Sequence, residues 1–198
     1  MPFDIDLHEI VETIDPEPLA RCVTSLLASA SSRFWTDPAS STGKYHPDYD
    51  NGFGGLVRHT VVVAAMAVDG CRRYGREDLR HVVVAAALCH DLWKNGASWG
   101  KYTVRSHGPI ASEKVSEKIS SFPEIARELD LVSYAVAWHY GIWCKPEARP
   151  PFSFMPLLDD DDYSTVALVL QEADFYCSRA FLGDPDEASL RGVLGCQK

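Results

Sequence analysis

The chain has 198 residues, of which 46% are hydrophobic and 24% are charged, the composition of a globular domain that can bury a hydrophobic core. Its formal net charge of −9 disfavours a surface that binds duplex nucleic acid by neutralising phosphates. The charge is compatible with a small nucleotide as partner, because a bound metal supplies positive charge locally.

Sequence features also bear on the compartment and the domain count. No apolar run reaches the roughly 20 residues of a membrane-spanning helix, so we expect no membrane partner. The start, MPFDIDLHEI, lacks the basic flank and apolar segment of a secretory signal. Without a repeat or a linker, the sequence predicts a single domain over residues 1–198, with a core at about 53–181 preceded by a helix and a loop in 1–52.

The six cysteines are widely scattered and form no Cys-x-x-Cys pair. In a domain of this size, that usage favours reduced core thiols in the cytoplasm over disulfides. They are Cys22, Cys71, Cys89, Cys144, Cys177 and Cys196.

Apolar residues recur at helical spacing through nearly the whole chain. The first such face predicts one helix and consists of Leu19, Val23, Leu26, Ala30 and Phe34. Further helices are predicted over residues 56–74, about 79–91, 109–119, 125–136 and 166–181, and from about 186 onward. Because strand signals are almost absent, we predict an all-α fold.

Two segments resist helix formation. Residues 35–55 are crowded with Pro, Gly, Ser, Asp and Tyr, and a loop of about 20 residues in a compact domain is unusual unless it serves a site, for example as a lid. Gly141 to Pro156 contains four prolines and is also predicted to be a loop. The acidic run from Asp159 to Asp162 is interpreted as stabilising the start of the next helix rather than as a metal site.

Four polar side chains lie on the apolar faces of different predicted helices: His59, His90, His139 and Asp174. A buried carboxylate without a partner costs several kcal/mol or shifts its pKa until it is neutral. One Asp and several His that share a metal ion avoid that cost. The alternative is a buried His–Asp hydrogen-bond network without metal.

Asp91 follows His90 directly, and neighbours on a helix point about 100° apart. Two adjacent ligands reach one ion most easily near a helix end, where backbone and side chain both adjust. Asn95-Gly96 predicts such an end, since Gly is common just past a helix C-terminus.

At these residues the sequence resembles a known family. The order His59, His90-Asp91, Asp174 is similar to the His…His-Asp…Asp signature of the HD superfamily of phosphohydrolases. The stretches GGLVRHT around His59, AALCHDLWK around His90-Asp91 and LQEAD up to Asp174 strengthen the resemblance. It covers about residues 53–181 and implies an HD-domain helical bundle of about six to seven helices.

His107 and His139 complete the order His…His-Asp…His…His…Asp, which resembles superfamily members that hold two metals. These include cyclic-dinucleotide phosphodiesterases, 3′-to-5′ exoribonucleases with an HD domain, and di-iron oxygenases related to myo-inositol oxygenase. Similarity to the exoribonucleases extends to Tyr102-Thr103 and to His139-Tyr140-Gly141, whereas the Gly-Tyr-Pro signature of the cyclic-dinucleotide enzymes is missing.

The resemblance implies a ligand set for two divalent metals. A first metal would be bound by His59, His90, Asp91 and Asp174. Asp91 would bridge to a second, held by His107 and His139. His and carboxylate ligands suit Mn, Fe, Co, Ni or Zn alike.

The implied activity is hydrolysis of a phosphoester of a nucleotide, nucleoside triphosphates included, or of a short single-stranded oligonucleotide. Hydroxide bridging two metals would attack phosphorus. Asp91 and Lys94 are the predicted catalytic residues, and Lys94, Arg105 and Tyr102 are the predicted substrate contacts. Arg58 points away from the ligand face and is interpreted as structural, and Trp93 stands where the family's central motif has Gly.

Two alternatives share the same residues. One is a mixed-valent di-iron oxygenase on the same scaffold, acting on a small organic substrate. The other is a sensor domain that binds metal without catalysis. The sequence leaves open the identity of the substrate and of the metals, the role of the 35–55 loop, and the existence of a homo-oligomer.

Overall fold

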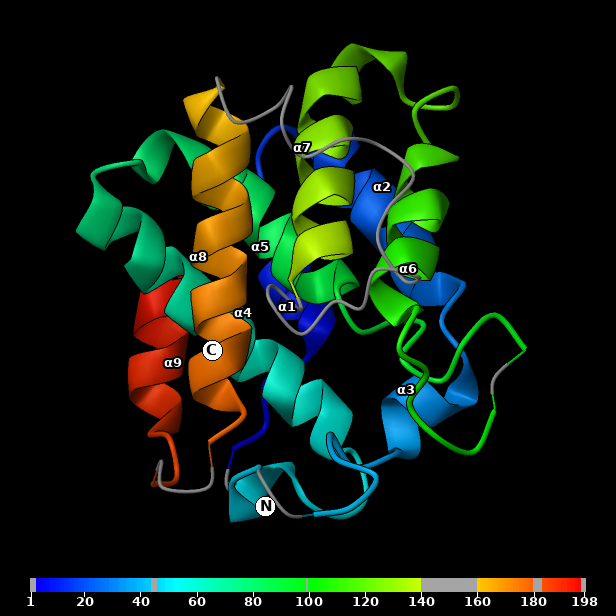
Figure 1. Ribbon diagram of the computed structural model, residues 1–198. Coiled ribbons are helices and arrows are strands. Elements are labelled where there is room, and N and C mark those ends of the chain that lie inside the picture. Colours follow the sequence, from blue (N-terminus) through cyan, green and yellow to red (C-terminus); the bar gives the residue numbers. More distant parts are fainter. Residues whose placement is uncertain (1–2, 44–45, 99, 140–159, 180–182, 197–198) are drawn as a thin grey trace.

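The computed structural model of the chain describes residues 3–43, 46–98, 100–139, 160–179 and 183–196 (Figure 1). These residues form helices and no strand, which confirms the all-α fold class. The α-helices are α1 (Leu7–Val11), α2 (Glu17–Ala28), α3 (Ser32–Thr36), α4 (Gly55–Tyr74), α5 (Arg80–Cys89), α6 (His107–Ser116), α7 (Ala126–Trp138), α8 (Asp161–Cys177) and α9 (Glu187–Leu194). Short 3-10 turns are η1 (Asp48–Asp50), η2 (Glu77–Leu79) and η3 (Pro123–Ile125). The loop predicted from Gly141 to Pro156 lies outside the described residues.

The main difference from the sequence prediction concerns the first helix, which the structure divides into α2 and α3. Helix α2 ends at Ala28, and the Ser29 hydroxyl donates to the Leu26 carbonyl at 2.7 Å. Ser31 is extended, with φ −68° and ψ 155°, and α3 begins after it. Serines compete with helical hydrogen bonds in this way, while Phe34 still returns to the core, so the apolar spacing alone conceals the break.

The acidic run before α8 acts as a helix start, as predicted, in its described part. The Asp160 side chain accepts the backbone N–H of Asp162 at 3.0 Å. Asp162 also pairs with the guanidinium groups of Arg76 and Arg127. Asp159 lies outside the described residues.

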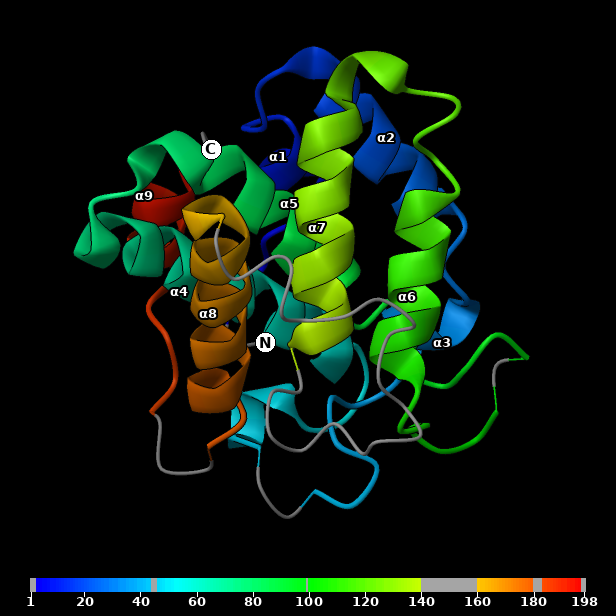
Figure 2. The same cartoon turned by 45° about the horizontal axis from the view of Figure 1, so that its top comes forward.

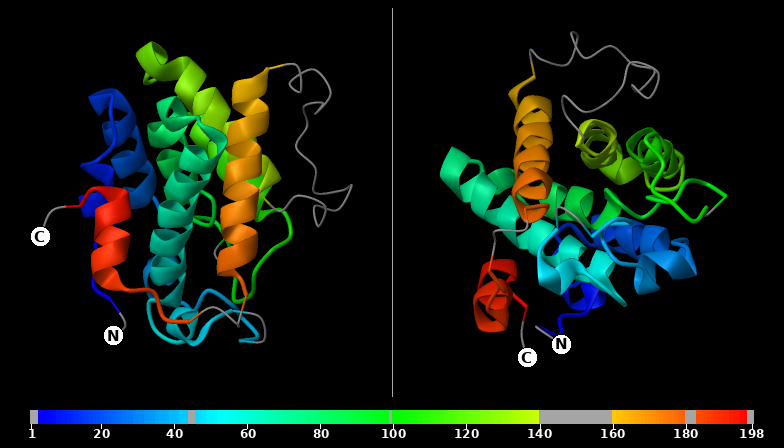
Figure 3. Two further views of the ribbon diagram at one scale, coloured as in Figure 1. Left: turned by 90° about the vertical axis from the view of Figure 1, so that its left-hand side faces the viewer. Right: turned by 60° about the horizontal axis from the view of Figure 1, so that its bottom comes forward.

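Helices α4, α5, α7 and α8 enclose the core. Helix α4 packs against α5 and α8, and α7 packs against α5, α6 and α8. Figure 2 shows α7 between α8 and α6, and the right-hand view of Figure 3 shows α6 and α7 nearly end-on beside each other. The ends of α5 and α7 and the start of α6 are thereby brought to one region beside α4 and α8.

The amino-terminal segment closes the side of the bundle next to α9 (Figure 3). Arg191 on α9 pairs with Glu9 of α1 and donates to the Asp4 carbonyl at 2.7 Å. Glu9 also completes a capping box with Asp6 at the start of α1, a five-residue helix too short for periodicity to predict.

Neither a disulfide nor a membrane span is found in the described part of the chain. The five cysteines there are free, and four of them are buried. Burial raises the pKa of the Cys22 and Cys71 thiols to about 11, which keeps them protonated and unreactive. None of the described helices is long and apolar enough to cross a membrane.

Candidate metal centre

All six predicted ligands meet inside the bundle. They arrive from five places: α4, the turn after α5, the start of α6, the residue after α7, and α8. Five of the side chains are at most 2% exposed, and the sixth, Asp174, is 20% exposed. The six are His59, His90, Asp91, His107, His139 and Asp174.

The adjacent pair His90-Asp91 stands near a helix end, as predicted, but α5 ends at Cys89, before the pair, and not at Asn95-Gly96. Beyond it the backbone continues as successive turns, with the N–H of Lys94 bonded to the Asp91 carbonyl at 3.0 Å and that of Gly96 to Trp93 at 2.8 Å. This departure from a regular helix lets both neighbours face the interior, so that His90 Nε2 lies 3.5 Å from Asp91 Oδ2. Trp93 is buried in the core.

The first group of ligand atoms is formed by His59, His90 and Asp174. His59 Nε2 lies 3.0 Å and His90 Nε2 4.0 Å from Asp174 Oδ1. The three donor atoms lie within 4.8 Å of one another, a spacing that one metal ion can span.

The second group is formed by Asp91, His107 and His139. His107 Nε2 lies 3.0 Å from His139 Nε2, and Asp91 Oδ1 lies 3.2 Å from the former and 4.0 Å from the latter. Because Asp91 Oδ2 faces His90 while Oδ1 faces this second group, its carboxylate stands between the two groups.

The backbone orients three of the four histidines. Nδ1 of His90, His107 and His139 lies 2.7, 2.7 and 2.6 Å from the carbonyl oxygen three residues earlier in each case. Since a carbonyl only accepts, Nδ1 must carry the proton, and Nε2 is left with its lone pair toward the interior. This is the tautomer that binds metal through Nε2.

The donor atoms fit a cation. The lone pairs of His107 Nε2 and His139 Nε2 face each other at 3.0 Å, an arrangement that a shared cation stabilises. Burial, with the neighbouring His107 and His90, lowers the pKa of His139 to about 3, so a proton does not take that place near neutral pH. His90 Nε2 is buried and has no hydrogen-bond partner among the described residues. His90 and His139, whose pKa values burial lowers, are neutral imidazoles that can act as ligands.

His59 behaves differently, because it lies between two carboxylates. Burial alone would lower its pKa, but hydrogen bonds to Asp174 and Asp50 raise it to about 9. In the absence of metal, the proton on Nε2 therefore holds His59 to Asp174. A metal ion that binds both side chains displaces this proton.

Lys94 turns back onto the ligand pair. Its Nζ lies 2.5 Å from Asp91 Oδ2, and its side chain is 14% exposed. Burial would raise the pKa of Asp91, but Lys94 and the adjacent histidines hold it well below its usual range. Asp91 is thus a carboxylate throughout the physiological range.

Lys94 also lines a cavity of about 170 Å³. Lys101, Tyr102 and Arg33 also line it, whereas Arg105 does not. Of the three predicted substrate contacts, the structure thus brings Lys94 and Tyr102 to one cavity and leaves Arg105 outside it. A larger cavity, of about 330 Å³, lies between α4 and α9 and contains none of the predicted site residues.

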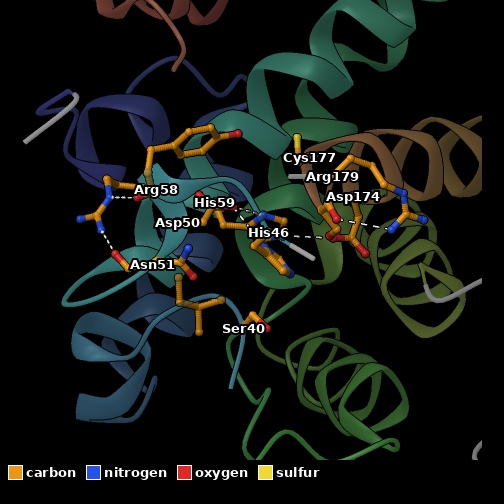
Figure 4. A network of polar contacts seen from close by, with 12 residues as sticks. Ser40, His46, Asp50, Asn51, Arg58, His59, Asp174, Cys177 and Arg179 are labelled. Atoms are coloured by element: carbon orange, nitrogen blue, oxygen red, sulfur yellow. Dashed lines mark hydrogen bonds and ion pairs between the residues drawn. The ribbon is translucent and has the colours of Figure 1, made fainter. Parts of the chain in front are cut away.

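Two residues at the centre, His46 and Asp50, were not predicted from the sequence. Both belong to the 35–55 loop, and with His59 they place three potential ligand atoms within 4.8 Å (Figure 4). Asp50 is fully buried although it lies in a segment without apolar periodicity. The one available signal was the unusual length of that loop.

Comparison with known proteins gives one match. The family model described as HD domain matches residues 56–178, a range that contains all six predicted ligands. Searches of curated proteins and of solved structures each gave no significant match.

Proposed function

Since this chain belongs to the HD domain family, a superfamily of metal-dependent phosphohydrolases, we propose that it hydrolyses a phosphoester of a nucleotide or short oligonucleotide with two divalent metal ions. The family model covers more than half of the chain. Membership of the family does not specify the number of ions or the substrate class, and both are proposed.

The observation that carries the proposal is the pair of ligand groups that share one carboxylate. Each group converges within 4.8 Å, and the two Asp91 oxygens face different groups. Two ions that share a carboxylate are the arrangement of many phosphoester-cleaving sites. The proposed ligands are His59, His90, Asp91 and Asp174 for one ion and Asp91, His107 and His139 for the other.

Divalent ions held there would supply Lewis acidity and activate water near neutral pH. The chain's own groups do the remaining work. The carbonyls that hold the Nδ1 protons of three histidines keep those ligands oriented. Lys94, which is paired with Asp91 and borders the cavity, would donate to a phosphate oxygen and offset its negative charge.

The cavity beside Lys94 suits a nucleotide better than an uncharged substrate. Three cationic residues line it, Lys94, Lys101 and Arg33, against one carboxylate, Asp37, which is paired with Arg33 at 2.8 Å. Cations form charge-assisted hydrogen bonds to phosphate oxygens. The exposed ring of Tyr102 offers a face on which a base can stack.

The test is a screen of nucleoside phosphates, dinucleotides, short single-stranded oligonucleotides and generic phosphodiesters against several divalent metals. We expect metal-dependent release of a phosphorylated product, abolished in Asp91→Asn. Asp69→Asn, an exposed carboxylate paired with Arg72 away from the ligands, should retain the activity.

Two outcomes would overturn the proposal. Consumption of dioxygen with a small organic substrate by the iron-loaded protein would assign the same ligand set to a di-iron oxygenase. Full metal occupancy without turnover of any phosphorylated compound in the screen would assign it to a sensor.

A further inference from the structure

The four histidines of the proposed centre differ in the atom that holds Nδ1. His90, His107 and His139 use backbone carbonyls. His59 instead uses the carboxylate of Asp50, whose Oδ2 lies 3.2 Å from Nδ1. The outer partner of His59 is therefore an anion supplied by a separate segment of the chain (Figure 4).

Asp50 is a buried carboxylate whose contacting oxygen faces two histidines. Its side chain is 0% exposed, and Oδ2 contacts Nδ1 of His59 and Nδ1 of His46, each at 3.2 Å. Oδ1 has no hydrogen-bond partner among the described residues. A carboxylate buried with one oxygen unpaired is unfavourable for folding, so its presence at this position calls for a functional explanation.

The segment that carries Asp50 is fastened to the helix that carries His59. The Arg58 guanidinium donates to the carbonyls of Tyr49, Asn51 and Phe53 at 2.5, 3.0 and 2.9 Å. One residue along, His59 turns inward to Asp50, so adjacent side chains of α4 hold the segment from both faces.

Gly55 allows this close approach. A Cβ atom added at Gly55 would lie 1.9 Å from the Asp50 carbonyl oxygen, so no other residue fits without moving the segment. The same carbonyl accepts the N–H of Ala39 at 3.0 Å. The backbone of Asp50 is thus fixed from both sides before any metal binds.

We propose that Asp50 is a positioning residue for the metal centre, which aims His59 Nε2 at Asp174 and His90 and strengthens His59 as a ligand. A carboxylate on the far nitrogen increases the basicity of an imidazole ligand and fixes its ring. Through Asp50, residues 46–55 would then contribute to the metal centre itself, in addition to lying over it. This inference rests on the metal centre of the proposed function.

The test measures binding of Co²⁺ alone, by competition with a chelator, in the full chain. Asp50→Asn keeps an oxygen that accepts the His59 proton and removes only the charge. In a His107→Ala background, which leaves the ion of the His59 group, we expect Asp50→Asn to weaken Co²⁺ binding about 10- to 100-fold. The matched control is Asp48→Asn, the same change at an exposed position of the same turn, which should leave the affinity unchanged.

A second background separates positioning from a general effect on folding. In His59→Ala, adding Asp50→Asn should leave the residual Co²⁺ affinity unchanged, because the imidazole that Asp50 positions is gone. Equal weakening there, or no weakening in the His107→Ala background, would overturn the inference. A third equivalent of Co²⁺ in the wild type that is lost with Asp50→Asn would also overturn it, since Asp50 would then be a ligand itself. Failure of the wild type to bind Co²⁺ would instead refute the proposed function.

Discussion

At the scale of single residues, the orientation of each histidine in the centre is set by the contact of its Nδ1 atom, the ring nitrogen that faces away from the proposed metal. Three of these nitrogens meet main-chain oxygens at 2.6–2.7 Å, and the fourth meets a buried carboxylate. Tautomer and ring orientation are thereby set by the folded chain alone. The consequences differ between the two ligand groups, and this difference can be measured.

Removing His107 or His139 should affect the two ions unequally. Both residues belong only to the group of Asp91 Oδ1, so His107→Ala or His139→Ala should deplete the second ion and retain most of the first. Metal analysis of protein purified without chelators gives the stoichiometry, with close to two equivalents expected in the wild type. Retention of both ions and of activity in either variant would show that these residues are bystanders.

The stability of the metal-free protein should depend on pH through His59. Its pKa is raised from 6.5 to about 9 in the folded chain, so folding gains stability that is fully present below pH 6.5 and lost as the pH rises through 9. Each pKa unit corresponds to about 1.4 kcal/mol. Urea unfolding with chelator present should therefore show a falling free energy of unfolding over this interval.

The matched variant for this pH dependence is His59→Gln, which does not titrate there. Its free energy of unfolding should change less between pH 6.5 and 9 than that of the wild type. An identical slope in both proteins would mean that another group is responsible.

At the scale of elements, the site depends on how closely helix ends approach each other. The start of α6 lies against the end of α7 in the fold, and Gly108 lies at this contact. A Cβ atom there would lie 3.0 Å from the Val136 carbonyl oxygen and 3.3 Å from Cε1 of His139. The distance between His107 and His139 therefore depends on the absence of a side chain at Gly108.

Gly108→Ala should push α6 away from α7. We expect a loss of about 1–3 kcal/mol in the free energy of unfolding, as for other overpacked contacts, together with weaker binding of the second ion. Gly192→Ala is the control, because nothing lies within 4 Å of a Cβ atom at that helical position. Ala is the better helix former, so that variant should be neutral or stabilised by up to about 1 kcal/mol. Chemical denaturation and metal analysis measure both effects.

Arg58→Ala tests the interpretation of Arg58 as a structural residue. The guanidinium holds three carbonyls of the segment before α4, and hydrogen bonds to charged groups contribute about 1.5–3 kcal/mol each without being additive. We expect thermal unfolding to show a net loss of about 2 kcal/mol. Arg72→Ala, at an exposed ion pair of the same helix, should change stability by less than about 1 kcal/mol. Equal effects would argue against the structural role.

Periodicity predicted most helices, because a helix that buries one face must repeat apolar residues along it. The same faces located His59 and Asp174 inside the bundle. The break between α2 and α3 was not predictable in this way, since it depends on local serine hydrogen bonds. Asp50 was missed because its burial depends on Arg58 and on the close approach at Gly55, and neither leaves a pattern in the sequence.

At the scale of the whole molecule, the ligands join distant parts of the chain. His59 and Asp174 are 115 positions apart in the sequence and lie 3.0 Å apart in the fold. The unfolded chain does not hold these groups together, so ions that bind here bind the folded protein in preference.

Metal removal should therefore lower stability. A ligand present at 100 times its Kd adds about 2.7 kcal/mol to the free energy of unfolding for each site. Differential scanning calorimetry with excess Co²⁺ or Zn²⁺, and again with chelator, should show a clearly higher melting temperature for the loaded protein. His59→Ala combined with His107→Ala should lose most of this difference. Equal melting temperatures of loaded and chelated wild type would contradict binding at these residues.

The carbonyl partners of His90, His107 and His139 have a consequence for how the sequence can vary. Every residue type has a carbonyl group, so positions 87, 104 and 136 can exchange side chains without altering these contacts, provided that the helices still pack. His59 has no such tolerance, because its partner exists only as a particular side chain at position 50. Random mutagenesis of the residues that contact the histidine Nδ1 atoms should therefore disturb the orientation of His59 readily, and that of His90, His107 and His139 only rarely.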